Sequence, residues 1–140
     1  MTLLLMGASA PEALHRRLRV VERESDAADG PCAVLASGEA CAAALRRAVD
    51  PSSGATALIL ESPTGIPSLS EVSIPTLVVL GTRDDAPAPL LGPRSHLVYV
   101  YDAGRTVSAD RPEAFADLVA DFVERGEAFV ISRTATVLHP

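Results

Sequence analysis

A short apolar run from Thr76 to Leu80, set between Pro75 and Gly81, constrains the fold of this chain most strongly. It is rich in β-branched residues and shows no polar alternation, which is typical of a strand covered on both faces. A second strand is predicted up to Tyr101, and a helix is expected from Pro112 because apolar residues then recur at helical spacing. This order of strand, loop, strand and helix predicts a parallel sheet with helices packed against it.

The upstream segments repeat the same alternation of strands and helices. Strands are predicted at residues 3–6, 19–22, 32–36 and 57–60, and helices at residues 9–18, 38–49 and from residue 112. Ser9 and Glu12 have the spacing of a capping box, and Asp110 is a candidate cap for the last helix. We therefore expect a three-layer, doubly wound, mostly parallel α/β sheet in one domain of residues 1–140, with a core at 1–127 and a further strand at 128–138.

Composition excludes several classes of function. The chain has 140 residues, 48% of them hydrophobic, and its net charge of -6 argues against binding to nucleic acid. All basic residues are arginine, and the absence of lysine removes Schiff-base chemistry. No apolar run has transmembrane length and the N-terminal run has no basic region before it, so we expect a cytoplasmic protein without membrane contact. The exclusive use of arginine is typical of a GC-rich genome, and a bacterial source is expected from it. Cys32 and Cys41 lack metal-ligand spacing, and neither a metal nor a cofactor is expected.

Three motifs in the second half of the chain resemble the α/β-hydrolase superfamily. In that family a strand of the form P-T-L-V-x-x-G-x-x-D delivers the catalytic acid, a later G-H pair delivers the catalytic histidine, and a P-E-x-F helix closes the fold. Here the strand after Pro75 leads to Asp84, and residues 112–115 match the closing helix. Gly104 is followed by Arg105, so arginine stands where the family has histidine.

The first half of the chain is similar to the same family in order and spacing. Residues 4–7 resemble the L-L-x-H-G strand, with Met6 in place of the family histidine, and the following loop at Ala8 would donate one oxyanion N–H. Residues 34–41 resemble the small-x-Ser-x-Gly nucleophile elbow, where a strand turns into a helix. The nucleophile position falls on Gly38, and the second oxyanion N–H would belong to Glu39. The resemblance covers Leu3 to about residue 125.

The resemblance implies a hydrolase relative with a degenerate triad. Acyl transfer needs a nucleophile that is activated by a base. Gly38 has no side chain, and the guanidinium of Arg105 has no lone pair with which to accept a proton. Only the acid at Asp84 remains, and its neighbour Asp85 is an alternative for that role. The favoured interpretation is therefore a module that binds a small molecule or a protein, with Arg105 paired to Asp84 or Asp85.

Two alternatives stay open. The protein is an active esterase if the elbow shifts by one residue and Ser37 becomes the nucleophile; Cys41 is a weaker nucleophile candidate inside the first helical turn. Alternatively, the chain is an assembly module with a vestigial crevice. The three histidines, His15, His96 and His139, do not fall on the expected crevice loops.

The crevice is expected where the carboxyl ends of the strands meet. The loops after Met6, Ala36, Leu80 and Tyr101 should share it. Ala8, Ser37, Glu39 and Asp85 are the expected binding residues, with Ala8 and Glu39 offering N–H groups and the Glu39 carboxylate favouring the start of the helix. Residues 63–73 are too few for a helical lid, and the strands that usually precede the first one seen here are missing, so we expect a minimal core.

The C-terminal segment from Ala128 to Leu138 predicts self-association. It is apolar on both faces, and an exposed strand of this kind is a liability unless it is paired. We expect a homodimer built partly through this segment. Analytical sedimentation should show a dimer for the full chain and a monomer or aggregate after truncation at Gly126. A soluble monomer in both cases would contradict the prediction.

Overall fold

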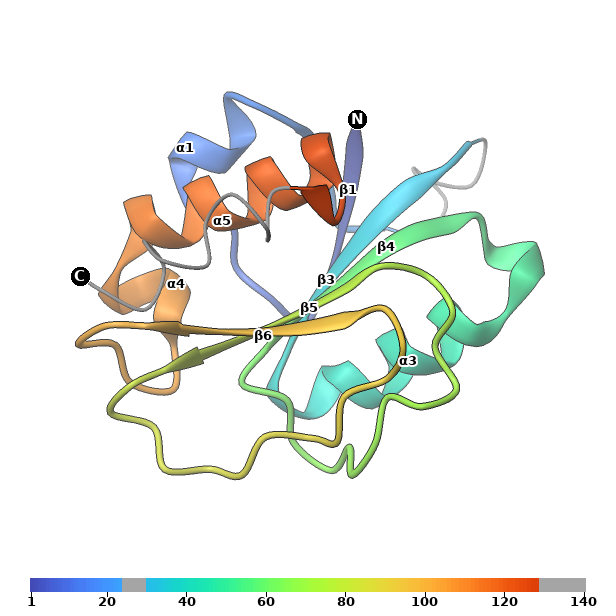
Figure 1. Cartoon of the computed structure of the whole chain (residues 1–140). Helices are drawn as coiled ribbons and strands as arrows, with labels where there is room; N and C mark the ends of the chain where they lie inside the picture. Colours follow the sequence, from blue (N-terminus) through green and yellow to red (C-terminus); the bar gives the residue numbers. More distant parts are fainter. Residues whose placement is uncertain (24–29, 129–140) are drawn as a thin grey trace.

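The computed structural model describes residues 1–23 and 30–128 of the chain. Within these residues six parallel strands form one sheet in the order β2-β1-β3-β4-β5-β6 (Figure 1). The strands are β1 (Thr2–Met6), β2 (Arg19–Val21), β3 (Cys32–Ser37), β4 (Ala55–Glu61), β5 (Thr76–Gly81) and β6 (Ser95–Val100). The helices are α1 (Glu12–His15), α3 (Cys41–Val49), α4 (Val107–Asp110) and α5 (Pro112–Arg125), with 3-10 turns η1 (Gly38–Ala40) and η2 (Pro51–Ser53).

The order of the strands creates a switch point between β1 and β3. The chain leaves β1 toward β2 on one side, then returns to pair β3 with the opposite edge of β1. Met6 pairs with Ala36, and Ser37 pairs with Glu61, so the carboxyl ends of β1, β3 and β4 lie at the same height. In open α/β sheets, ligands bind at such a point. The expected doubly wound parallel fold is therefore confirmed.

Each strand contributes to two hydrophobic cores because alternate side chains point to opposite faces. On one face, Leu3, Leu5 and Leu35 pack with α1 and α5, where Phe115 and Phe122 are fully buried. On the other face, Leu4, Val34 and Ala36 pack with α3 and with apolar side chains of the segment between β4 and β5. Figure 1 shows α1 and α5 on one side of the sheet and α3 on the other. The sheet is thus covered on both faces, as the apolar strands require.

Several local expectations differ from the structure. Asp110 does not cap α5; that helix begins after Arg111 without a side-chain cap, and the Asp110 carboxylate accepts a hydrogen bond from the backbone N–H of Gly104 instead, at 2.8 Å. The capping box at Ser9 and Glu12 is not formed, because α1 begins only at Glu12, after Pro11. The short helix α4 was not predicted, since four residues carry too little periodicity.

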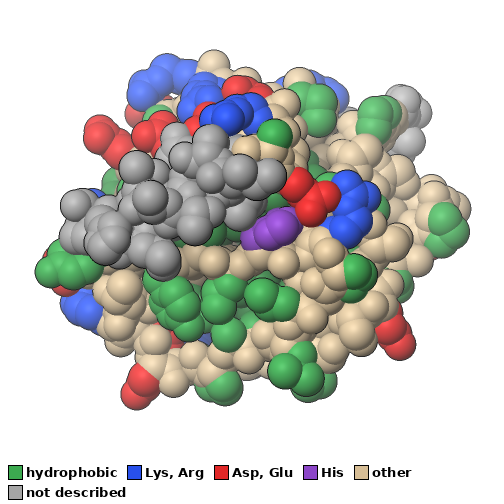
Figure 2. All heavy atoms as spheres, viewed as in Figure 1, with side chains coloured by type: hydrophobic (Ala, Val, Ile, Leu, Met, Phe, Trp, Pro, Cys, Tyr) green, Lys and Arg blue, Asp and Glu red, His purple; other side chains and the backbone are tan. Residues whose placement is uncertain are grey.

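The face that carries the edge strand β6 is partly apolar. Leu90, Leu91 and Tyr101 are exposed large hydrophobic residues. In Figure 2, hydrophobic side chains spread over this face below the grey atoms, and a histidine lies beside acidic and basic side chains.

No helix in the described ranges is long and apolar enough to cross a membrane. The predicted C-terminal strand at 128–138 lies outside the described residues, apart from Ala128.

Candidate functional site

The elbow after β3 has the backbone of a strand-to-helix turn and no side chain at its apex. β3 ends at Ser37, and Gly38, with φ +58, is the first residue of η1, which leads into α3. A residue with a side chain is rarely found in this left-handed region, whereas glycine adopts it readily. A β-carbon placed on Gly38 would have room, because the nearest atom is Nη2 of Arg105 at 4.0 Å. The aligned nucleophile position therefore has the elbow geometry but no nucleophile.

The loop after β1 packs directly against the start of α3. Gly7 has φ +61, and a β-carbon there would lie only 2.5 Å from the β-carbon of Ala40. Glycine at position 7 and a small residue at position 40 together allow this approach, since larger side chains would separate the loop from the helix. The contact holds Ala8 beside Ser37 and Gly38 in the crevice.

A buried glutamate forms the floor of the crevice. Glu61, the last residue of β4, is only 2% exposed. The hydroxyl of Ser37 donates to its Oε1, and the backbone N–H of Ser108 donates to its Oε2 at 2.7 Å. A buried carboxylate is costly unless it accepts hydrogen bonds, and both of these oxygens do. Glu61 therefore ties β3 and β4 to α4, a role that sequence reasoning missed.

The residues that follow Glu61 hold Arg105 above the elbow. Ser62, at φ +46, donates from its hydroxyl to the backbone carbonyl of Arg105 at 2.6 Å. Nη2 of Arg105 donates to the hydroxyl oxygen of Thr64, and the backbone N–H of Thr64 donates to the carbonyl of Gly38 at 3.2 Å. The segment after β4 thus fixes both the backbone carbonyl and the guanidinium of Arg105. The sequence had indicated only a polar connection without periodicity there.

The expected ion pair between Arg105 and Asp84 or Asp85 is not formed, and that prediction is wrong. Oδ1 of Asp84 accepts from the backbone N–H of Ala86 at 3.1 Å, while Oδ2 is buried and accepts no hydrogen bond from any described residue. Arg105 donates to Thr64 instead. The expectation assumed that the longer arginine side chain would keep the contact of the family histidine.

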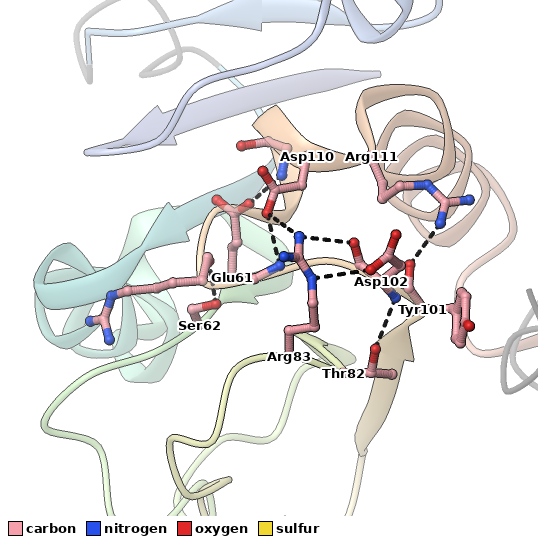
Figure 3. A network of polar contacts seen from close by, with 11 residues as sticks. Glu61, Ser62, Thr82, Arg83, Tyr101, Asp102, Asp110 and Arg111 are labelled. Carbon is pink, nitrogen blue, oxygen red and sulfur yellow. Dashed lines mark hydrogen bonds and ion pairs between the residues drawn. The ribbon is translucent and has the colours of Figure 1, made fainter.

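The loop after β5, which carries Asp84 and Asp85, nevertheless contacts the turn after β6. Arg83 makes the ionic contacts between these two segments. The backbone N–H of Arg83 donates to the carbonyl of Ala103 at 2.9 Å. Its guanidinium lies 3.2 Å from Asp102 and 3.6 Å from Asp110, as Figure 3 shows. Arg83 and Asp102 are more than half exposed, so each ion pair contributes only about 0–1 kcal/mol to stability. Together the contacts orient the turn that carries Arg105.

Two cavities meet at Arg105. The first has a volume of about 240 Å³ and is lined by residues 7–9, 37–38, 61–62, 105–106 and 108. The second has a volume of about 420 Å³ and is lined by residues 63–67, 86–87 and 105. Of the expected site residues, Ala8, Ser37, Gly38 and Arg105 line the first cavity. The side chains of Glu39 and Asp85 are exposed, and these residues and Asp84 line neither cavity.

Cys41, His15 and His96 do not supply an alternative nucleophile or base to the crevice. Cys41 is fully buried, and burial together with the negative charge of Glu61 raises the pKa of its thiol to about 12, which disfavours the reactive thiolate. His96 contacts Glu127 at 2.9 Å, and His15 is exposed on α1. His139 lies outside the described ranges. Within those ranges, no three histidine, cysteine or acidic side chains group as a metal site.

Comparison with known proteins connects this geometry to the α/β-hydrolase fold. A predicted CIB-like hydrolase from Thermoplasma acidophilum superposes with a TM-score of 0.66 at 13% identity, over 89% of this chain and 86% of that one. The serine hydrolase CarC, involved in carbazole degradation, superposes with a TM-score of 0.68 at 15% identity, over 88% and 90%. NosK from Streptomyces actuosus gives 0.62 at 18% identity, over 89% and 97%.

Sequence comparisons add no closer relative. No family model matches the chain, and no curated protein matches it. The identities to the solved structures lie below 20%, so the likeness is one of fold. The chain therefore has an α/β-hydrolase-like fold, as its motifs predicted.

The close approach of Gly7 to α3 predicts a specific stability difference between two glycines. Gly7→Ala should lower the free energy of unfolding by roughly 2–5 kcal/mol, because it combines left-handed strain with a steric overlap against Ala40. Gly65→Ala is the matched control: its φ is +75 but nothing lies within 4 Å of the added carbon, so only about 1–2 kcal/mol of strain is expected. Urea unfolding measures both. Equal losses would show that the loop and helix do not pack as described.

Proposed function

We propose that this protein has lost serine-hydrolase chemistry and binds a small molecule in the crevice at the switch point of its sheet. The observation that carries the proposal is the elbow itself. Gly38 keeps the backbone turn on which a nucleophile would stand, and the guanidinium of Arg105 lies above it. Glycine cannot attack a carbonyl carbon, and a guanidinium cannot accept the proton of a nucleophile.

The crevice retains the properties of a binding site. Its two cavities measure about 240 and 420 Å³, a combined size within the roughly 300–1,000 Å³ typical of small-molecule sites. The first combines backbone groups with serine hydroxyls, and the second is bordered largely by proline and aliphatic residues. A ligand can therefore be oriented by polar groups at one end and held by apolar contact at the other.

A second candidate function is an esterase that uses Ser37, and one contact favours it. The Ser37 hydroxyl donates to Oε1 of Glu61, so a carboxylate lies where it could remove the proton of the serine. Two features argue against this role. Glu61 is buried and already accepts a backbone hydrogen bond at Oε2, which suits a structural link between strands. Ser37 also lies one residue before the elbow apex, so its side chain does not take the nucleophile position.

The proposal predicts that wild-type protein does not react with a fluorophosphonate. Intact-mass spectrometry after incubation should show no covalent adduct, and hydrolysis of p-nitrophenyl acetate should match that of the Ser37→Ala variant. The physical reason is that the described residues place neither a nucleophile nor a histidine base at the elbow. A stoichiometric adduct at Ser37, lost in Ser37→Ala together with ester hydrolysis, would establish the esterase instead.

A further inference from the structure

Arg105 lies at the junction of the two cavities, and the residues that the structure describes accept from few of its hydrogen-bond donors. Its guanidinium carries five N–H donors, and the contact at its tip is one bond from Nη2 to the neutral hydroxyl of Thr64. No carboxylate in the described part of the chain forms an ion pair with it, in contrast to Arg83, which contacts Asp102 and Asp110. Within residues 1–23 and 30–128, no ion pair therefore compensates the positive charge at the junction.

We propose that the crevice binds an amphipathic monocarboxylate, with its carboxylate on Arg105 and its apolar body in the 420 Å³ cavity. This inference rests on the proposed function, because it assigns the ligand class of the same site. A planar guanidinium matches a carboxylate through two parallel hydrogen bonds, which makes the pair stronger and more directional than a contact between point charges. Arg105 borders both cavities, so a carboxylate bound to it stands at the mouth of the apolar one.

The walls of the larger cavity suit an aliphatic or small ring body. Pro63, Ile66, Pro67, Ala86 and Pro87 contribute to its lining. Proline has no backbone N–H, so much of this wall offers no hydrogen-bond donor and recognises a ligand by apolar contact. Ile66 also packs into the core on the α3 face, which gives the wall a fixed support. Burial of the apolar body there supplies the affinity that an exposed arginine alone would not give.

The smaller cavity limits the ligand to one carboxylate. Its floor is the buried Glu61, whose oxygens already accept from Ser37 and from the backbone of Ser108. A second carboxylate placed there would meet a like charge at short range in a partly desolvated site, which is unfavourable. A hydroxyl or ammonium group is tolerated at that position, whereas a dicarboxylate is not.

Three six-carbon probes with different head groups test the charge requirement: hexanoate, hexanol and hexylammonium. Titration into the full chain is followed by ¹H–¹⁵N NMR at the amides of Gly65, Ile66 and Ala86. We expect saturable shifts with hexanoate at a much lower concentration than with the other two. Arg105→Met should weaken hexanoate binding roughly tenfold or more, because it removes a charge-assisted bidentate contact. Arg46→Met, an exposed arginine on α3, is the matched control and should leave binding unchanged.

A second variant tests whether the apolar body of the ligand lies in the larger cavity. Ala86→Phe adds a ring at the wall of the larger cavity and keeps the backbone N–H that donates to Asp84. It should weaken hexanoate while leaving the much weaker acetate titration unchanged. Equal binding of hexanol and hexanoate, an Arg105→Met variant with wild-type affinity, or no shift with any probe would overturn the inference. None of these results depends on covalent labelling, so a wild-type fluorophosphonate adduct would separately overturn the proposed function.

Discussion

The buried carboxylate of Glu61 is the contact on which the geometry of the crevice depends. It stands at the end of β4, and its two oxygens accept from Ser37 on β3 and from the backbone of Ser108 in α4. The sheet alone would fix β3 beside β4, but it would not fix the segment after β6 over their ends. Burial makes these two hydrogen bonds necessary, because an unpaired carboxylate at that position would lower the stability of the fold by several kcal/mol. The turn that carries Arg105 is held in place from this side by Glu61 and from the other by Arg83.

These contacts surround an elbow with glycine at position 38 and arginine at position 105. The chain keeps the left-handed turn at position 38, the close packing of Gly7 on Ala40 and an acid at Asp84 with one buried oxygen that accepts no hydrogen bond from the described residues. At the two positions where acyl transfer would need side chains, glycine provides none and arginine provides a permanent cation. A positive charge above an open turn changes the electrostatics of the crevice: it disfavours proton abstraction and favours an anion. We propose that this fold supports binding where related folds support catalysis.

The sequence predicted the parts of this structure that follow from local patterns. Apolar strand-length runs located the six strands, and Pro112 with the helical spacing after it located α5. The order of motifs placed Gly38 at the elbow and Arg105 near it. Long-range side-chain contacts could not be predicted in this way. Glu61 is a single polar residue after an apolar run and gave no periodic signal, although a carboxylate at the carboxyl end of a central parallel strand is a hint of a site. Arg105 was expected to contact Asp84, and its direction depends on Thr64, which is 41 positions away in sequence.

We propose that position 38 holds the nucleophile site and position 105 the histidine site of a hydrolase fold that lacks hydrolase chemistry. The most direct test is fluorophosphonate labelling of the double variant Gly38→Ser, Arg105→His, with the adduct located by peptide mass spectrometry. There is room for a side chain at position 38, since only Nη2 of Arg105 approaches it, at 4.0 Å. Our account predicts an adduct at position 38 in the double variant and none in the wild type or in either single variant. Labelling at Ser37, or equal labelling of the wild type and the double variant, would contradict it.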